Sequence, residues 1–429
     1  MDDPEFATPE VDINTQTILL HASNHDLVAL KPYLRQPGNA SVQDPETGYT
    51  PLHAAIAACG PSKLELGGGI YKEDGTVAEE EVDIEKAKEV VKELFLSGAI
   101  WNDLDTSNET PGCMAWRLGQ KELYELCVEA GVRAEMLLGL LGGYEPLADE
   151  DSEDEEMDAQ LDGAEPQELN TAERSAQNGT NGHTAEVEER GDKKDVNSED
   201  YLKSELKFED DKLLDANANG VMMAWETDIM RRTVDLLIPS NEPGKRILNI
   251  GFGMGIVDRI FRDTRPLSHH IIEAHPGVLA KLQEQGSDFG KSWEESAPEG
   301  GSYKIHAGKW QDIVPKLLEG GEVFDAIYFD TFGEDYLQLK MFFTEYVVGL
   351  LDPEGKFGFF NGLGADRRVC YDVYCRVSEL DLCDAGMDVE WTDVPVEGLG
   401  GEGEGEWRGV RRRYWTLDKY RLPICSFMG

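Results

Sequence analysis

The sequence is poor in positive charge. Its 429 residues include 40 Lys and Arg against 85 Asp and Glu, which gives a formal net charge of −45. A protein with that charge repels the phosphates of nucleic acids, whereas a basic partner is attracted to it. We therefore expect no direct nucleic-acid binding.

Membrane segments and metal-binding spacings are also lacking. No apolar stretch is long enough to span a bilayer, and the start MDDPEFATPE has no apolar core of the kind found in signal peptides. The seven cysteines are scattered without a Cys-x-x-Cys pair, as is typical of reduced thiols in cytosolic or nuclear proteins. We expect a monomer of the cytoplasm and nucleus, without a membrane association and without a metal site.

One segment has few residues that could form a core. Residues 149–198 begin with the acidic run DEDSEDEEMDAQLDGAEPQELN and continue without aromatic residues. Such a composition cannot bury enough apolar surface to offset the entropy lost on ordering. The segment is predicted to be a disordered acidic linker, acting as a solvated tether or, alternatively, as a docking site for a basic partner.

The region before the linker, residues 1–148, shows a repeat signature. Residues 50–55 read TPLHAA, the ankyrin pattern in which Thr-Pro turns into a helix, and a degenerate copy starts at Thr110-Pro111. A helix is expected over 85–100, with an insertion at 64–81. This pattern predicts an all-α, ankyrin-repeat-like domain for protein recognition, with an unrelated helical-hairpin domain as the alternative.

The region after the linker, residues 199–429, alternates between two patterns. Short apolar runs at 246–250, 269–274, 303–307, 324–330 and 355–360 are separated by helical patterns at 255–263, 278–285, 310–318 and 339–351. Alternation of this kind predicts an α/β domain with a parallel, doubly wound sheet. The segments DVEWTDV (388–394) and RRYWTL (412–417) are expected to form a closing hairpin around a mobile loop, GLGGEGEGEW (398–407).

A glycine turn follows the first of these strands, in the sequence RILNIGFGMG (246–255). Glycines at the carboxyl end of a buried strand permit positive φ and close approach of a ligand to the backbone. Dinucleotide folds require G-x-G-x-x-G, but the sixth position counted from Gly251 is Ile256. The observed G-x-G-x-G is instead the first motif of S-adenosylmethionine methyltransferases.

Three carboxylates accompany the turn. Glu273 ends the second strand, twenty positions after Gly253, where a carboxylate accepts both ribose hydroxyls of a nucleotide. Asp330 ends the fourth strand after four apolar or aromatic residues. Glu226 follows Trp225 in GVMMAWETDIM (220–230), which is expected to open a helix and whose methionines fit a hydrophobic core as well as a cofactor site.

Together these motifs resemble a known family. VMMAWETDIM, RILNIGFGMGI, IIEAH, HAGKW and YFDT occur in the order and spacing of guanidinoacetate N-methyltransferase, and the whole chain resembles the fungal protein arginine N-methyltransferase 2 family. The resemblance implies a class I, Rossmann-like methyltransferase domain that uses S-adenosylmethionine. It also implies type IV activity, which monomethylates the internal (δ) guanidino nitrogen of arginine in a protein, expected to be ribosomal.

The resemblance assigns roles to individual positions. Glu226 and Asp330 match the two carboxylates that hold the guanidinium. The positions implied at the cofactor are Tyr201, Met222, Met230, Gly251, Phe252, Gly253, Met254, Gly255, Ile256, Val257, Glu273, Ala274, His275, Lys309, Trp310 and Asp330. Two departures from the pattern are Asn249, where many methyltransferases carry an acid, and Asp228-Ile229, where the family has Pro-Tyr.

Guanidine chemistry independently requires such carboxylates. A guanidinium ion has a pKa above about 12 and no free lone pair while its resonance is intact. Carboxylates can fork onto its N–H groups, fix its orientation and accept the proton that methylation releases. We assign proton acceptance to Asp330 and orientation to Glu226, while an exchange of these roles stays open.

Two other functions remain compatible with the residues. The chain could methylate a small guanidino metabolite and carry the helical domain as an accessory. It could also be a non-catalytic ankyrin scaffold with an inert methyltransferase fold, although retention of Glu226, Glu273 and Asp330 argues against this.

Overall fold

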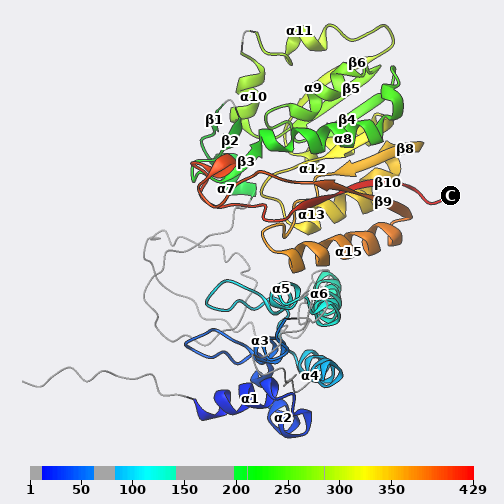
Figure 1. Cartoon of the computed structure of the whole chain (residues 1–429). Coiled ribbons are helices and arrows are strands. Elements are labelled where there is room, and N and C mark those ends of the chain that lie inside the picture. The colour runs from blue at the N-terminus through cyan, green and yellow to red at the C-terminus, as the bar shows by residue number, and fades with distance from the viewer. Residues whose placement is uncertain (1–11, 62–82, 142–197, 210, 285) are drawn as a thin grey trace, which may run out of the picture.

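The computed structural model describes residues 12–61, 83–141, 198–209, 211–284 and 286–429. These residues form a helical domain and an α/β domain, which lie one below the other in Figure 1. The predicted insertion at 64–81 and residues 149–197 of the predicted linker lie outside the described residues.

The helical domain is built from successive pairs of helices. Its elements are α1 (Ile13–Ser23), α2 (Leu27–Leu34), the 3-10 turn η1 (Asn39–Ser41), α3 (Pro51–Ala57), α4 (Ile84–Leu96), α5 (Pro111–Arg117) and α6 (Lys121–Leu141). Helices α3 and α5 both begin at a Thr-Pro pair, and the hydroxyls of Thr50 and Thr110 accept hydrogen bonds from backbone N–H groups of the first turn. The predicted helix starts are therefore confirmed, whereas the ankyrin class stays a prediction.

The α/β domain is organised around a seven-stranded mixed sheet. Its strands are β4 (Arg246–Ile250), β5 (Ser268–Glu273), β6 (Ser302–Ala307), β7 (Phe324–Phe329), β8 (Leu351–Phe359), β9 (Met387–Pro395) and β10 (Lys419–Phe427). The strand order is β6-β5-β4-β7-β8-β10-β9, with β4 to β8 parallel and β10 antiparallel to both neighbours. This arrangement confirms the predicted Rossmann-like α/β fold.

Helices cover both faces of this sheet (Figure 1). They are α8 (Thr227–Leu237), η3 (Pro239–Asn241), α9 (Ile256–Asp263), α10 (Pro276–Leu282), α11 (Lys291–Glu294), α12 (Trp310–Glu319), α13 (Tyr336–Met341), the π-helical η4 (Phe342–Val347), α14 (Val348–Leu350) and α15 (Arg368–Asp384). One hydrophobic cluster joins the sheet to α8, α9 and α10, and a second joins it to α12, η4 and α14. Burial on both faces explains why the parallel strands are continuous apolar runs.

A second, small sheet precedes the large one. It contains β1 (Lys207–Phe208), β2 (Lys212–Leu214) and β3 (Gly220–Met223), flanked by α7 (Ser198–Lys203) and the 3-10 turn η2 (Ala224–Glu226). The prediction that the segment 220–230 opens as a helix is wrong at its start, because Met222 and Met223 pair with β2 and the helix begins at Thr227.

The closing hairpin differs in its second strand. Strand β9 confirms the segment 388–394, but its partner is β10 at 419–427 rather than 412–417. The segment 412–417 forms a loop, in which Trp415 is buried. Within 398–407 the chain forms the 3-10 turn η5 (Gly405–Trp407), and the Trp407 side chain is also buried. The apolar residues of 412–417, which suggested a strand, are instead explained by the burial of Trp415 in a loop.

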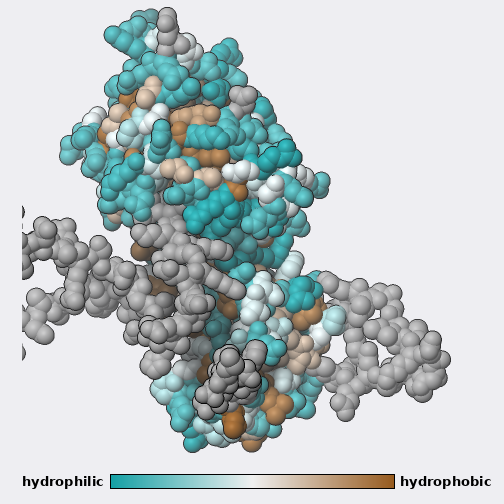
Figure 2. Space-filling view, turned by 90° about the vertical axis from the view of Figure 1, so that its left-hand side faces the viewer, coloured by the Kyte–Doolittle hydropathy of each residue, from teal (hydrophilic) through white to brown (hydrophobic). Residues whose placement is uncertain are grey.

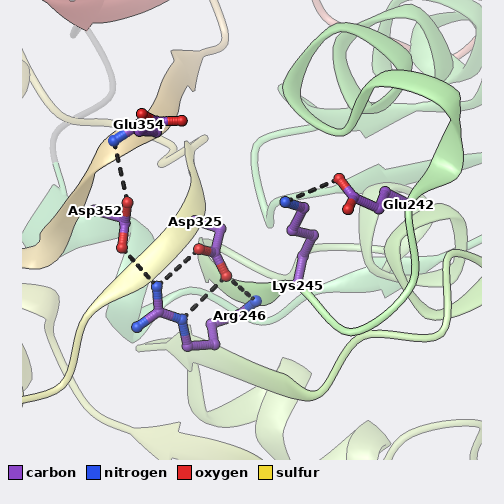
Figure 3. Close-up of polar contacts among 6 residues, drawn as sticks. All are labelled: Glu242, Lys245, Arg246, Asp325, Asp352 and Glu354. Atoms are coloured by element: carbon purple, nitrogen blue, oxygen red, sulfur yellow. Dashed lines mark hydrogen bonds and ion pairs between the residues drawn. The ribbon is translucent and has the colours of Figure 1, made fainter.

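An arginine fixes the amino ends of the three central strands (Figure 3). The guanidinium of Arg246 on β4 donates to both carboxylate oxygens of Asp325 on β7, at 2.7 and 3.0 Å, and to Asp352 on β8 at 2.9 Å. A forked, planar contact of this kind permits one alignment of the strands. The opposite, carboxyl ends of these strands are thereby also aligned.

The two domains share a hydrophobic core. Val369, Val373 and Val377 form one stripe of α15, and all three are buried in the cluster that contains the helical domain. Around this stripe Tyr124 of α6 donates to Asp372, and the Arg368 guanidinium lies 4.5 Å from the centre of the Trp116 ring. The helical domain is therefore packed directly on the α/β domain.

The face of the α/β domain seen in Figure 2 is mostly polar. Hydrophilic residues cover most of the α/β domain in the view of Figure 2, with hydrophobic patches between them. In the part of the chain that the structure describes, no helix is both long and apolar enough to cross a membrane.

Two glycines of α6 test the shared core. A Cβ at Gly131 would lie 2.5 Å from Val373 Cγ2, whereas at Gly139 its nearest contact is Lys340 Nζ at 4.0 Å. Helical Gly→Ala gains about 1 kcal/mol, whereas overpacking a core costs about 1–3 kcal/mol. We expect Gly131→Ala to lower the free energy of unfolding by up to about 2 kcal/mol and Gly139→Ala to raise it by up to about 1 kcal/mol, as measured by chemical denaturation. A stabilising Gly131→Ala would contradict the interface.

Candidate active site

The glycine turn after β4 packs directly against the backbone that follows β7. Gly251, Gly253 and Gly255 all have positive φ, at 93, 54 and 70°. A Cβ on Gly251 would lie 1.9 Å from the carbonyl oxygen of Asp330, so no side chain fits there. The turn therefore presents bare backbone at the carboxyl edge of the sheet, which is where ligands bind in open α/β folds.

Glu273 connects the end of β5 to this turn. Its Oε2 accepts from the backbone N–H of Phe252 at 2.9 Å and of Gly253 at 3.3 Å, and its Oε1 accepts from His275 N at 2.6 Å. Burial raises the pKa of this carboxyl, and the backbone donors oppose that rise. The carboxylate is thus fixed in place, and it lines the cavity described next.

A cavity lies over this edge. Nine of the sixteen predicted cofactor positions line it, namely Tyr201, Met222, Gly251, Gly253, Glu273, Ala274, Lys309, Trp310 and Asp330. The small sheet and α7 form its cover: the Tyr201 ring packs 4.7 Å from that of His275, and Met222 Sδ lies 3.2 Å from Met254 N. Residues of α7 and β3 thus lie over the glycine turn and line the cavity together with it.

The other seven predicted positions lie outside this lining. Phe252 and Met254 face a neighbouring cavity on the far side of the turn. His275 is buried, with Nε2 3.0 Å from the Tyr201 carbonyl oxygen. The remaining four are Gly255, Ile256 and Val257, at the start of α9, and Met230, which is in the core. The predicted contact of these seven residues with the cofactor therefore stays a prediction.

Glu334 borders the cavity and was missed by the sequence analysis. Its carboxylate accepts from Trp310 Nε1 at 3.0 Å, Gln311 Nε2 at 2.9 Å and Thr331 Oγ1 at 2.6 Å. It thereby fixes the indole that lines the cavity. In the sequence, only its position four residues after Asp330 suggests that Glu334 lies near the site. Its partner Trp310 is 24 positions away, so no local pattern connects the two.

A second cavity adjoins the first and shares part of its lining. Glu226 lines only the second, whereas Asp330 lines both. Glu226 is 4 % exposed and accepts from the Tyr414 hydroxyl and, at 3.4 Å, from Met223 N. Asp330 Oδ2 is buried without a hydrogen-bond partner among the described residues. Two carboxylates from distant segments therefore meet at the junction of the cavities.

The surroundings disfavour negative charge on both groups. Burial, with the added charge of Asp330, raises the pKa of Glu226 to about 8. Burial, with the added charge of Asp258, raises the pKa of Asp330 to about 7. Buried, strongly perturbed carboxyls facing a cavity are characteristic of functional sites. A bound cation would offset the repulsion.

Comparisons with known proteins agree with this geometry. The protein-family model for guanidinoacetate N-methyltransferase matches residues 193–365. Protein arginine N-methyltransferase 2 of Gibberella zeae is 57% identical over 94% of this chain and 90% of its own, and that of Neurospora crassa is 54% identical over 99% and 97%. The protein of the same name from Aspergillus fumigatus is 49% identical over 97% of both chains. The chain belongs to the fungal protein arginine N-methyltransferase 2 family.

Membership in this family makes the chain a methyltransferase dependent on S-adenosylmethionine, as the sequence predicts. The cavity suits that cofactor, because it combines bare backbone at Gly251 and Gly253, a fixed carboxylate at Glu273 and an aromatic wall at Trp310. Among solved structures, spermidine synthase from Thermotoga maritima is similar over 52% of this chain, with a TM-score of 0.33 and 12% identity. That likeness is too weak to bear on function.

A matched pair of glycines tests the close approach of Gly251 to the Asp330 carbonyl. Gly251 and Gly244 have similar φ, 93 and 87°, but a Cβ on Gly244 would meet nothing within 4 Å. Both alanine variants therefore carry the same backbone strain, and only Gly251→Ala clashes with Asp330. We expect Gly251→Ala to weaken S-adenosylmethionine binding by at least about tenfold in calorimetry, and Gly244→Ala to leave it unchanged. Equal affinities would show that this close approach does not shape the site.

Proposed function

We propose that the chain transfers a methyl group from S-adenosylmethionine to the internal (δ) nitrogen of an arginine side chain in a protein. The observation that carries this proposal is the position of Asp330, which lines both cavities and lies near the charge of Glu226. The relatives named protein arginine N-methyltransferase 2 support the substrate class. The choice of the δ nitrogen depends on the family resemblance.

The first cavity would hold the cofactor. Glu273 would bind the ribose hydroxyls, Lys309 and Trp310 would flank the adenine, and the glycine turn would contact the methionine end. When bound, S-adenosylmethionine supplies an electrophilic methyl group on its sulfonium. The cover formed by Tyr201 and Met222 would exclude water from that group.

The second cavity would hold the arginine. Glu226 and Asp330 would bind its N–H groups and fix the guanidinium plane against the first cavity. As the attacking nitrogen loses planarity, their charge stabilises the positive charge left on the other nitrogens. Asp330 Oδ2, which has no other partner among the described residues, would accept the proton that leaves that nitrogen.

The packing of the helical domain favours a protein substrate over a small metabolite. Asp335 lines the second cavity, and the next residue, Tyr336, packs against the core of the helical domain. The helical domain is thus packed against the segment that lines the second cavity. We propose that the domain is of the ankyrin type and docks the substrate, which we expect to be ribosomal.

Several expectations from the sequence stay predictions. They are a monomeric state, residence in the cytoplasm and nucleus, and absence of direct nucleic-acid binding. A non-catalytic scaffold is disfavoured, since it would not need two buried carboxyls that face a cavity.

Label transfer tests the activity directly. We expect proteins of a fungal extract incubated with the full-length chain and isotope-labelled S-adenosylmethionine to carry label on the internal guanidino nitrogen of an arginine, identified by fragmentation mass spectrometry. Label on a terminal nitrogen would overturn the δ assignment. Label confined to small guanidino compounds would indicate a metabolite enzyme, and absence of label with bound donor would indicate a scaffold.

Replacement of Asp330 separates catalysis from donor binding. Asp330→Asn keeps the size of the side chain but removes the proton acceptor. We expect its turnover to fall by about 10²–10⁴-fold, the range typical of general bases, while calorimetry shows retained S-adenosylmethionine binding. Near-normal turnover would exclude Asp330 as the acceptor and leave Glu226 as the candidate.

Asp330→Asn should also make the stability of the protein less dependent on pH. The pKa values of Glu226 and Asp330, about 8 and about 7, exceed the ordinary 4.5 and 3.8, so the folded protein holds these protons more tightly than the unfolded chain. Stability is therefore lost as pH rises from about 4 to about 8. We expect the drop in melting temperature between pH 5 and pH 8 to be smaller in Asp330→Asn than in the wild type. Asp263→Asn, which changes an exposed carboxylate, is the control and should behave as wild type.

A further inference from the structure

The loop between β9 and β10, residues 396–418, supplies a wall of the second cavity. It lies against the small sheet, where Lys212 Nζ donates to the Arg408 carbonyl at 2.8 Å and Arg411 N donates to the Ala218 carbonyl at 2.7 Å. Tyr414 of this loop lines the second cavity. A segment from the end of the chain thereby reaches the predicted substrate site.

Tyr414 is held in one orientation. Its ring lies 5.0 Å from that of Trp407 and 6.0 Å from that of Trp225, between centroids. Gly220 makes room for it, since a Cβ there would lie 2.9 Å from Tyr414 Cε1. The hydroxyl at the end of this packed ring donates to Glu226 Oε1.

We propose that Tyr414 is a positioning residue for methyl transfer, which holds Glu226 Oε1 so that the carboxylate presents Oε2 to the guanidinium. The inference rests on the proposed function, in which Glu226 acts as a clamp that binds and orients the guanidinium. Oε2 is available for this contact, because its hydrogen bond from Met223 N is long, at 3.4 Å. Rotation of the carboxylate would break the bond to Tyr414.

The same hydrogen bond favours the charged clamp. Glu226 is also near the carboxyl of Asp330 and the phenols of Tyr328 and Tyr420. Burial and Asp330 raise the pKa of Glu226, and the hydroxyl of Tyr414 opposes that rise. Without the hydroxyl, Glu226 would remain protonated to higher pH, and a neutral carboxyl binds a cation weakly.

Removal of one oxygen atom tests the proposal in the full-length chain. Tyr414→Phe retains the ring packing and loses the hydrogen bond. With methylguanidine as the probe and S-adenosylhomocysteine present, we expect the affinity for methylguanidine to fall by about tenfold, because Glu226 would be neither held in position nor as readily ionised. The acid limb of its pH dependence should move to higher pH, while S-adenosylhomocysteine affinity stays unchanged.

The matched control is Tyr303→Phe. The Tyr303 hydroxyl donates to the Pro266 carbonyl at 2.9 Å, away from both cavities, so its removal should change neither affinity nor pH dependence. If Tyr414→Phe does not fold, Gly220→Ala offers a second route, because the added methyl crowds the Tyr414 ring. Its expected result is the same loss of methylguanidine binding.

A double-mutant cycle separates this inference from the proposed function. If Tyr414 acts through Glu226, Tyr414→Phe should have no further effect in a Glu226→Gln background. Equal losses in both backgrounds, or an unchanged pH dependence, would overturn the positioning role. If Glu226→Gln alone leaves methylguanidine binding intact, the clamp fails and the inference fails with it. If Glu226→Gln weakens binding but Tyr414→Phe does not, only the inference fails.

Discussion

The site depends on one steric constraint, the passage of the chain at Gly251 directly against the carbonyl of Asp330. Hydrogen bonds from Asp330 N to Ile250 O and from Gly251 N to Ile272 O continue the pairing of the strands beyond their ends. The glycine turn, Glu273 and Asp330 therefore leave the sheet at one level. The forked contact of Arg246 fixes the same alignment from the opposite ends of the strands.

Burial gives the two carboxyls their chemistry and also makes them costly. Aromatic residues enclose Glu226, and both Glu226 and Asp330 have their pKa raised toward neutrality by desolvation. In water such groups would be fully ionised and would interact with solvent rather than with a guanidinium. The fold tolerates this cost because the loop 396–418 and the small sheet are packed in the same hydrophobic cluster as the large sheet.

The sequence predicted the parts of the fold that depend on local pattern. The parallel strands were recognisable because strands buried on both faces are continuous apolar runs, as in RILNI and FDAIYF. The short strand at 220–223 was missed, because four residues carry too little periodicity to separate a strand from a helix start. The strand β10 was missed as well, since Pro423 lies within it.

The site was predictable where motifs are contiguous and not where the chain returns from a distance. Glu226, Glu273 and Asp330 follow recognisable strands or motifs, and each lines a cavity. Tyr414 is separated from Glu226 by 188 positions, and no local pattern connects them. The valine stripe of α15 likewise indicates only an amphipathic helix, and its partner is visible solely in the packed structure.

That stripe has a consequence for how the chain responds to its surroundings. Because Val369, Val373 and Val377 belong to one core with the helical domain, unfolding of either domain would expose apolar surface of the other, so the stabilities of the two are coupled. A protein that binds the helical domain in its folded form therefore also protects the catalytic domain from unfolding, by mass action. Conversely, damage to a helix far from the carboxylates would shorten the lifetime of the active enzyme without altering its chemistry.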